Sequence, residues 1–416
     1  MDPEIQATQA GTIALARVSA GVLGLHLARV CAQFLWAALL ARQLGAAGYG
    51  SFSGLVSLGL VLGGLSGLGF GLRLYRDTVR EPALFSLRWK EATRVLVLTA
   101  IPLGALFVLL CRPLFPQAGI STLVAVALAE LLLTPFLQQV AHAYAAHRRV
   151  VAAAAVPIWV SAGRLVAVLV LPVLSPGGDL VTYGVLHCLC TAGVAVACWL
   201  ACRASLGPDV SLGCAITTPN LGEGLSLSGI VLAGSALANA DKVASLRWGG
   251  PELAGHYTAA QRFVSLVCLP VDALVAAALP RLFDAGARPA RRSQLLGTLA
   301  ALALGYGAVA GLVVWLSAPA LVWLLGAEFD AAVPLVQSFV WLVPAYALRQ
   351  VGTHALLGFG RVGWRVGCEA AAFGLLMVLI ARWLPELGAE GVVKAVVAVE
   401  YVLVLAVWSG LVRAMR

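Results

Sequence analysis

The sequence predicts an all-α membrane protein that crosses the bilayer about twelve times. Hydrophobic residues make up 61% of the 416 residues, charged residues only 11%, and the mean hydropathy is +0.94. A soluble protein of this length carries roughly a quarter of its residues as charged side chains. Apolar stretches of about 20 residues, the length that crosses a hydrocarbon core, recur from end to end without a soluble domain between them. A duplicated motif divides these stretches into two sets of six.

The expected spans of the first set are residues 13–39, 47–72, 94–111, 120–144, 151–174 and 180–202. Those of the second set are residues 224–246, 254–280, 295–318, 332–357, 364–384 and 391–412. The N-terminal residues MDPEIQATQAGT carry acids rather than the basic region of a signal peptide, and no small-residue cleavage site follows a short apolar core. We therefore expect the first helix to remain in the mature protein.

A repeat relates the two sets of spans. The stretch RQLGAAGYGSF, which begins at Arg42, returns as RWGGPELAGHYT from Arg247, at an offset of 205 residues that also aligns Gly45 with Gly250 and Gly50 with Gly255. Two further pairs, LQQV with LRQV and HRRV with FGRV, repeat at offsets of 211 and 212 residues. Because six spans separate the copies, both have the same orientation, as in parallel repeats. We expect lobes of residues 1–208 and 209–416, joined by the Gly- and Pro-containing loop of residues 203–224.

Each copy of the motif is expected to be the turn between the first two helices of its lobe. The glycines permit a tight reversal and a close approach of helices. Tyr49 and Tyr257 are expected to anchor these turns at the membrane interface. We interpret the two motifs as the frame of the site rather than the site itself.

The basic residues lie on alternate loops. With the N-terminus inside, seventeen fall on the cytoplasmic side, and only Arg42, Arg112, Arg247 and Arg382 fall outside. The seventeen are Arg73, Arg76, Arg80, Arg88, Lys90, Arg94, Arg148, Arg149, Arg203, Arg281, Arg288, Arg291, Arg292, Arg361, Arg365, Arg413 and Arg416. This asymmetry predicts that both termini are cytoplasmic. It also accounts for the formal charge of +9 without a nucleic-acid partner.

The loop of residues 72–94 interleaves cations with Leu, Phe and Trp. Such a segment is either a topology anchor or a basic amphipathic element on the anionic inner leaflet.

Seven basic residues lie within or at the edge of the expected helices: Arg17, Arg29, Arg164, Lys242, Arg262, Arg349 and Lys394. A charge at the bilayer centre costs at least about 2.5 kcal/mol, so such residues normally face a cavity or a partner. Five acids also lie in helices: Glu130, Asp241, Asp272, Glu369 and Glu400. Each could neutralise a cation in a structural ion pair. The excess of cations favours an anionic ligand.

No enzyme site is evident in the sequence. It contains no phosphate-binding glycine loop, no metal-ligand spacing of histidines and no long outer loop that could carry an acid cluster. Cys188 and Cys190 beside His187 could form a metal site, but a single apolar helix rarely brings such ligands together. We read the nine cysteines as small apolar residues and expect no cofactor and no metal.

Four stretches resemble the polysaccharide transporter (O-antigen flippase) family of the multidrug/oligosaccharidyl-lipid/polysaccharide exporter superfamily. They are LARQLGAAGYGSFSGLVSLGLVLGGLSGLGF, NADKVASLRWGGPELAGHYTAAQRFVSLVCLPVDALVAAALPRLF, LLGAEFDAAVPLVQSFVWL and ELGAEGVVKAVVAVEY. The resemblance implies a V-shaped pair of six-helix lobes around a cationic cavity. It also implies that the protein flips an oligosaccharide linked to undecaprenyl pyrophosphate across the bacterial inner membrane, for lipopolysaccharide or other surface polysaccharide. Other polysaccharide assembly proteins and membrane lipids are the partners it implies.

The cationic character of that cavity carries over to five residues: Arg29, Arg164, Lys242, Arg262 and Arg349. A cavity for a glycan must also replace water around hydroxyl groups. The polar candidates for this role are His26, Gln33, Gln138, Gln139, His142, Asn239, Gln261 and Gln350. Glu130, Asp241 and Asp272 are candidates for binding a coupling proton or Na⁺, because a buried acid near a cation can change charge with the side of access.

Two other functions stay open at this point. A drug or cation antiporter of the same superfamily should have a net acidic cavity. A membrane enzyme of glycan assembly should have a catalytic constellation.

Overall fold

The computed structural model describes residues 3–213, 221–283 and 289–415, and every regular element among them is helical. Part of the expected inter-lobe loop, residues 214–220, lies outside the described residues. The first half of the chain contains α1 (Pro3–Gly63), η1 (Ser66–Gly69), α2 (Phe70–Arg80), η2 (Pro82–Leu84), α3 (Phe85–Leu114), α4 (Ile120–Leu128), η3 (Ala129–Leu133), α5 (Thr134–Ala146), α6 (Val150–Leu174) and α7 (Leu180–Leu206). The second half contains α8 (Leu221–Phe283), α9 (Pro289–Ser317), α10 (Ala320–Leu325), η4 (Ala327–Ala332), α11 (Val333–Phe339), α12 (Leu342–Gly358), α13 (Val362–Leu387) and α14 (Ala389–Met415).

The two longest helices, α1 and α8, are each interrupted at the glycine that the repeat aligns. Gly45 has φ 65° and ψ −179°, and Gly250 has φ 85° and ψ 172°. This combination of angles is open almost only to glycine. Asp241 and Tyr257, sixteen positions apart, are hydrogen-bonded across the break in α8, although a continuous helix would separate them by about 24 Å. The expected turn at Gly250 is therefore confirmed, and Gly45 adopts the matching backbone conformation.

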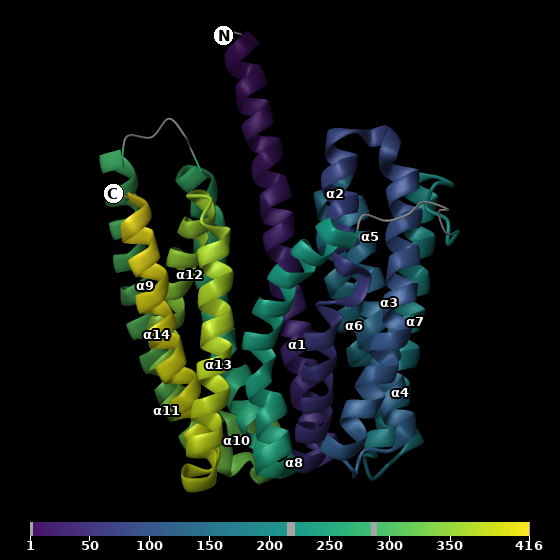
Figure 1. The fold of residues 1–416 in the computed structure, drawn as a ribbon, viewed down its shortest axis with the longest axis vertical. Coiled ribbons are helices and arrows are strands. Elements are labelled where there is room, and N and C mark those ends of the chain that lie inside the picture. The colour runs from purple at the N-terminus through teal and green to yellow at the C-terminus, as the bar shows by residue number, and fades with distance from the viewer. Residues whose placement is uncertain (1–2, 214–220, 284–288, 416) are drawn as a thin grey trace. The chain divides into compact units, whose positions relative to one another are not determined.

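The chain divides into two compact units. The first unit comprises Met1–Gln43 and Leu62–Leu232, and the second comprises Leu44–Val61 and Ala233–Arg416. The units are defined by contacts within the fold. A segment of the first half, residues 44–61, belongs to the same unit as most of the second half of the chain. The division into lobes 1–208 and 209–416 stays a prediction. In the second unit α12 packs between α9 and α14, and α13 packs on α14 (Figure 1).

Eight helices in the described part of the chain are long and apolar enough to cross a membrane, or nine when the bent pair Ala327–Phe339 and Leu342–Leu356 counts as one span. The stretch Gly24–Gly63 counts once among them, although its 40 residues are twice the length that one span needs and are broken at Gly45. The protein is thus an all-helical, multi-pass membrane protein.

The core of the first unit forms where α2, α3, α5, α6 and α7 meet. Trp89 is fully buried there, and its indole nitrogen donates a hydrogen bond to the carbonyl oxygen of Ser211 at 2.7 Å. Gln139 of α5 lies in the same region and donates to the Thr93 hydroxyl at 2.9 Å. This contact uses the Gln139 amide to join α5 to α3.

Candidate functional site

A buried charge network lies in the first unit around Glu130. This residue belongs to η3, a single π-helical turn that connects α4 to α5, and it is 1% exposed. Its Oε1 atom accepts from Arg164 Nη2 at 2.8 Å and lies 3.1 Å from His187 Nε2. Wide π turns inside helices are frequent at functional sites. The turn places a carboxylate of one helix against side chains of α6 and α7.

Aromatic side chains surround this network. The Arg164 guanidinium lies over the Trp36 ring at 5.5 Å, and the Trp36 indole nitrogen donates to the Tyr183 hydroxyl at 2.6 Å. A guanidinium held by a carboxylate and an aromatic face is stabilised electrostatically in a site with little water. The predicted cation Arg164 and the predicted acid Glu130 are therefore partners of each other.

A second cluster lies within α8 of the second unit, around Asp241. This acid is 2% exposed and accepts hydrogen bonds from Tyr257 at 2.5 Å and from Gln261 at 2.6 Å. The Lys242 amine lies 3.4 Å from the carboxylate and donates to the Ala238 carbonyl oxygen at 2.8 Å. The turn at Gly250 creates this cluster, because it brings the two arms of α8 together.

The third cluster joins α8 to α12 at Asp272. The Tyr346 hydroxyl donates to its two oxygens at 2.9 and 3.1 Å, and the Gln350 amide donates to Oδ1 at 2.6 Å. Both donors are neutral. Among the described residues, Asp272 has no ion pair with a cation.

The remaining predicted acids pair with basic residues. Arg349 of α12 binds Glu400 of α14 at 2.5 Å, and Arg365 binds Glu369 at 2.8 Å within α13. Replacing one partner of such a buried pair leaves an uncompensated charge, which costs about 3–5 kcal/mol. Arg349 is thus fixed by a structural partner within the second unit.

Arg29 differs from these paired cations. Its side chain is half-buried on α1, and no described residue gives it a hydrogen bond or an ion pair. The α1 residues around it include Gln33, half-buried, and His26, exposed. Arg262 is half-buried on α8.

The other predicted polar residues have differing environments. Gln138 is exposed, Gln139 is buried between α5 and α3, and Asn239 donates to the Ser235 carbonyl oxygen of its own helix at 2.9 Å. His142 is half-buried and lies beside Gly71 of α2. Gln261 and Gln350 each donate a hydrogen bond to a predicted acid, Asp241 and Asp272 respectively.

Some residues of the clusters were not predicted as site residues from the sequence. The sequence suggests His187 only as a metal ligand, and no group of three metal-binding side chains occurs in the described part of the chain. Tyr257 and Tyr49 are expected at the membrane interface, yet they are 0% and 1% exposed. The interfacial role is therefore wrong for both tyrosines. A tyrosine sixteen residues from an acid becomes a candidate partner only when the turn between them is known.

Several arginines of the basic loop of residues 72–94 form ion pairs with acids of the same loop. Arg73 and Arg88 bind Asp77 at 3.5 and 2.9 Å, and Arg88 also binds Glu91 at 2.6 Å. These arginine side chains are 11% and 19% exposed. They are consequently committed to joining α2 to α3 rather than to an anionic lipid surface.

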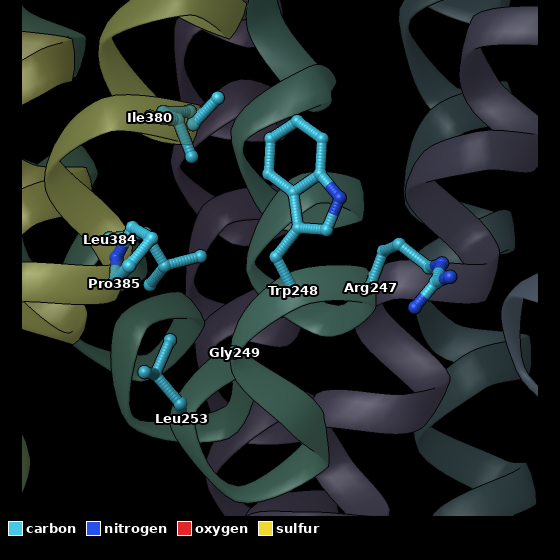
Figure 2. A pocket seen from close by; sticks show the side chains of 8 residues that line it. Arg247, Trp248, Gly249, Leu253, Ile380, Leu384 and Pro385 are labelled. Carbon is cyan, nitrogen blue, oxygen red and sulfur yellow. The ribbon is translucent and has the colours of Figure 1, made fainter.

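One groove of about 600 Å³ lies between α8 and α13 and includes four residues of the second repeat motif, Arg247, Trp248, Gly249 and Leu253. Figure 2 shows the Trp248 ring facing the groove, whereas the Arg247 side chain extends away from Ile380 and Leu384. The groove is therefore mainly apolar.

Comparison with solved structures identifies the fold. An inward-facing multidrug resistance transporter of the MATE family matches with a TM-score of 0.70 and 14% identity over 92% of this chain and 93% of that chain. The lipid II flippase MurJ in an inward closed conformation matches with a TM-score of 0.74 and 11% identity over 95% of this chain and 88% of that one. A transporter from Pyrococcus furiosus, whose reversed pocket polarity is described as suggesting a different function, matches with a TM-score of 0.60 and 14% identity. The match covers 96% of this chain and 95% of that chain. The fold is that of the MOP superfamily of membrane transporters.

The sequence then gives the family. Residues 19–285 match the family described as "Polysaccharide biosynthesis protein", so the chain belongs to that family. No curated protein matches the sequence. The chain is thus a membrane protein of the polysaccharide biosynthesis family with the fold of the MOP superfamily.

Proposed function

We propose that this transporter flips an oligosaccharide linked to undecaprenyl pyrophosphate across the bacterial inner membrane, for O-antigen or another surface polysaccharide. Sugar hydroxyls and a pyrophosphate do not cross hydrocarbon unsolvated, so protein groups must replace their water. The membership in a polysaccharide biosynthesis family supports the substrate class. The proposed topology has both termini in the cytoplasm, as the distribution of basic residues indicates.

The observation that carries the anionic substrate is Arg29. Its buried Nε has no hydrogen-bond partner, and none of the described carboxylates pairs with it. A membrane-embedded guanidinium in this state is costly, and a phosphate offers it the bidentate contact that its planar fork fits. Arg262 and Lys242 are the further cations proposed to face the substrate. Arg164 and Arg349 are proposed to act as members of their ion pairs.

We further propose that the carrier works by alternating access and is reset by a proton or Na⁺. Asp272 is the first candidate for binding that ion, because the described residues that donate hydrogen bonds to it, Tyr346 and Gln350, are neutral. Glu130 and Asp241 are the other candidates. Each already has a cation within ion-pair distance.

The test of the substrate uses Arg29→Gln and Arg29→Lys, with surface polysaccharide and membrane abundance measured for each. A charged hydrogen bond contributes about 1.5–3 kcal/mol, so Arg29→Gln should lower the translocation rate about tenfold or more while the protein stays in the membrane. Arg29→Lys should restore only part of the rate, because Lys keeps the charge and loses the bidentate fork.

Two control sets separate binding from folding. Arg112→Gln changes an exposed arginine near the end of α3 and should leave polysaccharide unchanged. Arg349→Gln should reduce membrane abundance, and adding Glu400→Gln should restore it, since the double variant leaves no unpaired buried charge. Normal polysaccharide in Arg29→Gln would contradict the proposal, and export of organic cations by the same protein would favour the antiporter.

A further inference from the structure

Three segments that are distant in the sequence meet in the second unit. They are the first turn, residues 44–52, the second turn, residues 249–257, and η4 (Ala327–Ala332). The two turns are the copies of the repeat motif. The third segment belongs to the stretch LLGAEFDAA, to which neither the ion pairs nor the proposed substrate contacts assign a role.

The two turns contact each other reciprocally through equivalent residues. A Cβ atom added to Gly50 would overlap the carbonyl oxygen of Pro251, and one added to Gly255 would overlap the carbonyl oxygen of Ala46. The repeat offset of 205 residues aligns Gly50 with Gly255 and Ala46 with Pro251. The contact is therefore self-complementary, like the interface of a two-fold dimer. Backbones at this distance leave room only for glycine.

The η4 segment holds both turns. Glu328 Oε2 accepts the Ala46 backbone N–H at 3.3 Å, and the Glu328 carbonyl oxygen accepts His256 Nε2–H at 2.8 Å. The buried Phe329 ring packs edge-on against Tyr49 at 6.3 Å and against His256 at 5.8 Å. A Cβ atom on Gly45 would come within 2.8 Å of Glu328 Oε2. Glu328 and Phe329 thus contact the first turn and also the second turn.

We propose that these three segments form a latch that closes the transporter on the side of the two turns and that must separate in each transport cycle. The inference rests on the proposed alternating access. Closely packed backbone contacts have discrete closed and open arrangements rather than a continuous range, which suits a gate. Because the contact is reciprocal, a single rotation of one turn away from the other breaks both glycine contacts together. Glu328 acts as a positioning residue, since it contacts the turns and no substrate.

The test measures the distance between spin labels at Ala47→Cys and Glu252→Cys, two exposed and repeat-equivalent positions, with the native cysteines replaced. The unaltered latch should give one short distance. Gly50→Ala and Gly255→Ala should each shift the population to a longer distance, because the added methyl group occupies the contact. A wild-type distance in both glycine variants would overturn the proposal.

Matched variants separate the loss of the glycine contact from a general effect of substitution in the turn. Gly249→Ala lies in the same turn, but its methyl group would meet only the flexible end of the Leu253 side chain, so the distance should stay short. Glu328→Ala adds no atoms and should lengthen the distance, whereas Glu328→Gln keeps an acceptor for the Ala46 N–H and should not. If the glycine variants do not accumulate, the two Glu328 variants test the latch in their place. The same spin-label distance in Glu328→Ala and Glu328→Gln would then refute it.

A short bis-maleimide that joins positions 47 and 252 tests whether the latch must open. Cross-linked protein should lose transport activity measured as surface polysaccharide, and the uncross-linked double variant should retain it. Full activity after complete cross-linking would show that opening is not required. The spin-label distances need no substrate, so they test the latch even if the proposed glycan is wrong.

Discussion

At the scale of single residues, the charges in the helices are mostly paired with side chains that are distant in the sequence. Glu130 meets Arg164 across 34 positions, and Arg349 meets Glu400 across 51. These pairs reduce the excess positive charge that the sequence suggests for a cavity. Arg29 and Asp272 are left as the cation and the acid, respectively, without an opposite charge among the described residues.

This contrast leads to a prediction for ion coupling. Asp272→Asn preserves hydrogen-bonding groups for Tyr346 and Gln350 but removes the ionisable oxygen pair. Transport in this variant should no longer respond to the proton or Na⁺ gradient, while protein abundance stays normal. The measurement is translocation in vesicles with and without an imposed gradient.

Glu130→Gln and Asp241→Asn are the comparison variants for this experiment. Each of these removes the partner of a cation, so the expected effect is lower abundance rather than specific uncoupling. Gradient-dependent transport in Asp272→Asn would exclude that residue as the coupling site.

At the scale of elements, α2 and the start of α3 are joined by a cluster of three arginines and two acids. Burial alone raises the pKa of the Asp77 carboxyl, but the nearby guanidiniums of Arg76, Arg88 and Arg73 outweigh it and hold the pKa below its ordinary value. The hydrogen bonds from Arg76 to Asp77, at 2.8 and 2.9 Å, are part of this effect. Arg73, Arg76 and Arg88 of this loop therefore serve an intramolecular contact.

The lowered pKa of Asp77 sets the pH dependence of this contact. A depressed folded-state pKa contributes stability that is fully present above the unfolded value of about 3.9 and is lost as the pH falls through the folded value. Thermal unfolding of purified protein should show wild type more stable than Asp77→Asn at pH about 6, with the difference shrinking below pH about 4. An equal difference at both pH values would contradict the assignment.

At the scale of the whole molecule, the fold is that of a multi-pass membrane protein, and its orientation in the membrane is a prediction. A cysteine at Arg149, in the turn after α5, should react with an impermeant thiol reagent only from the cytoplasm. One at Gly177, in the exposed turn before α7, should react only from outside. Labelling in intact cells and in inverted vesicles measures both. The loop of residues 284–293 should label like Arg149, although residues 284–288 lie outside the described residues.

The sequence by itself determined the membrane class, the helical fold, the repeat and the glycine turns, because these depend on local composition and periodicity. Gly45 and Gly250 combine a positive φ with an extended ψ, which glycine adopts because it has no Cβ atom. The repeat marks both positions. The family also followed, since its motifs are continuous stretches of sequence.

Only the tertiary structure decided which charges neutralise each other and which segments the repeat brings together. The partners of Glu130, Asp241 and Glu400 depend on helix packing and on the reversal of α8, and no spacing along the chain encodes those distances. The reciprocal contact of Gly50 and Gly255 depends on the same packing. A repeat in the sequence shows that two segments are equivalent. Whether they touch depends on how the chain folds around them.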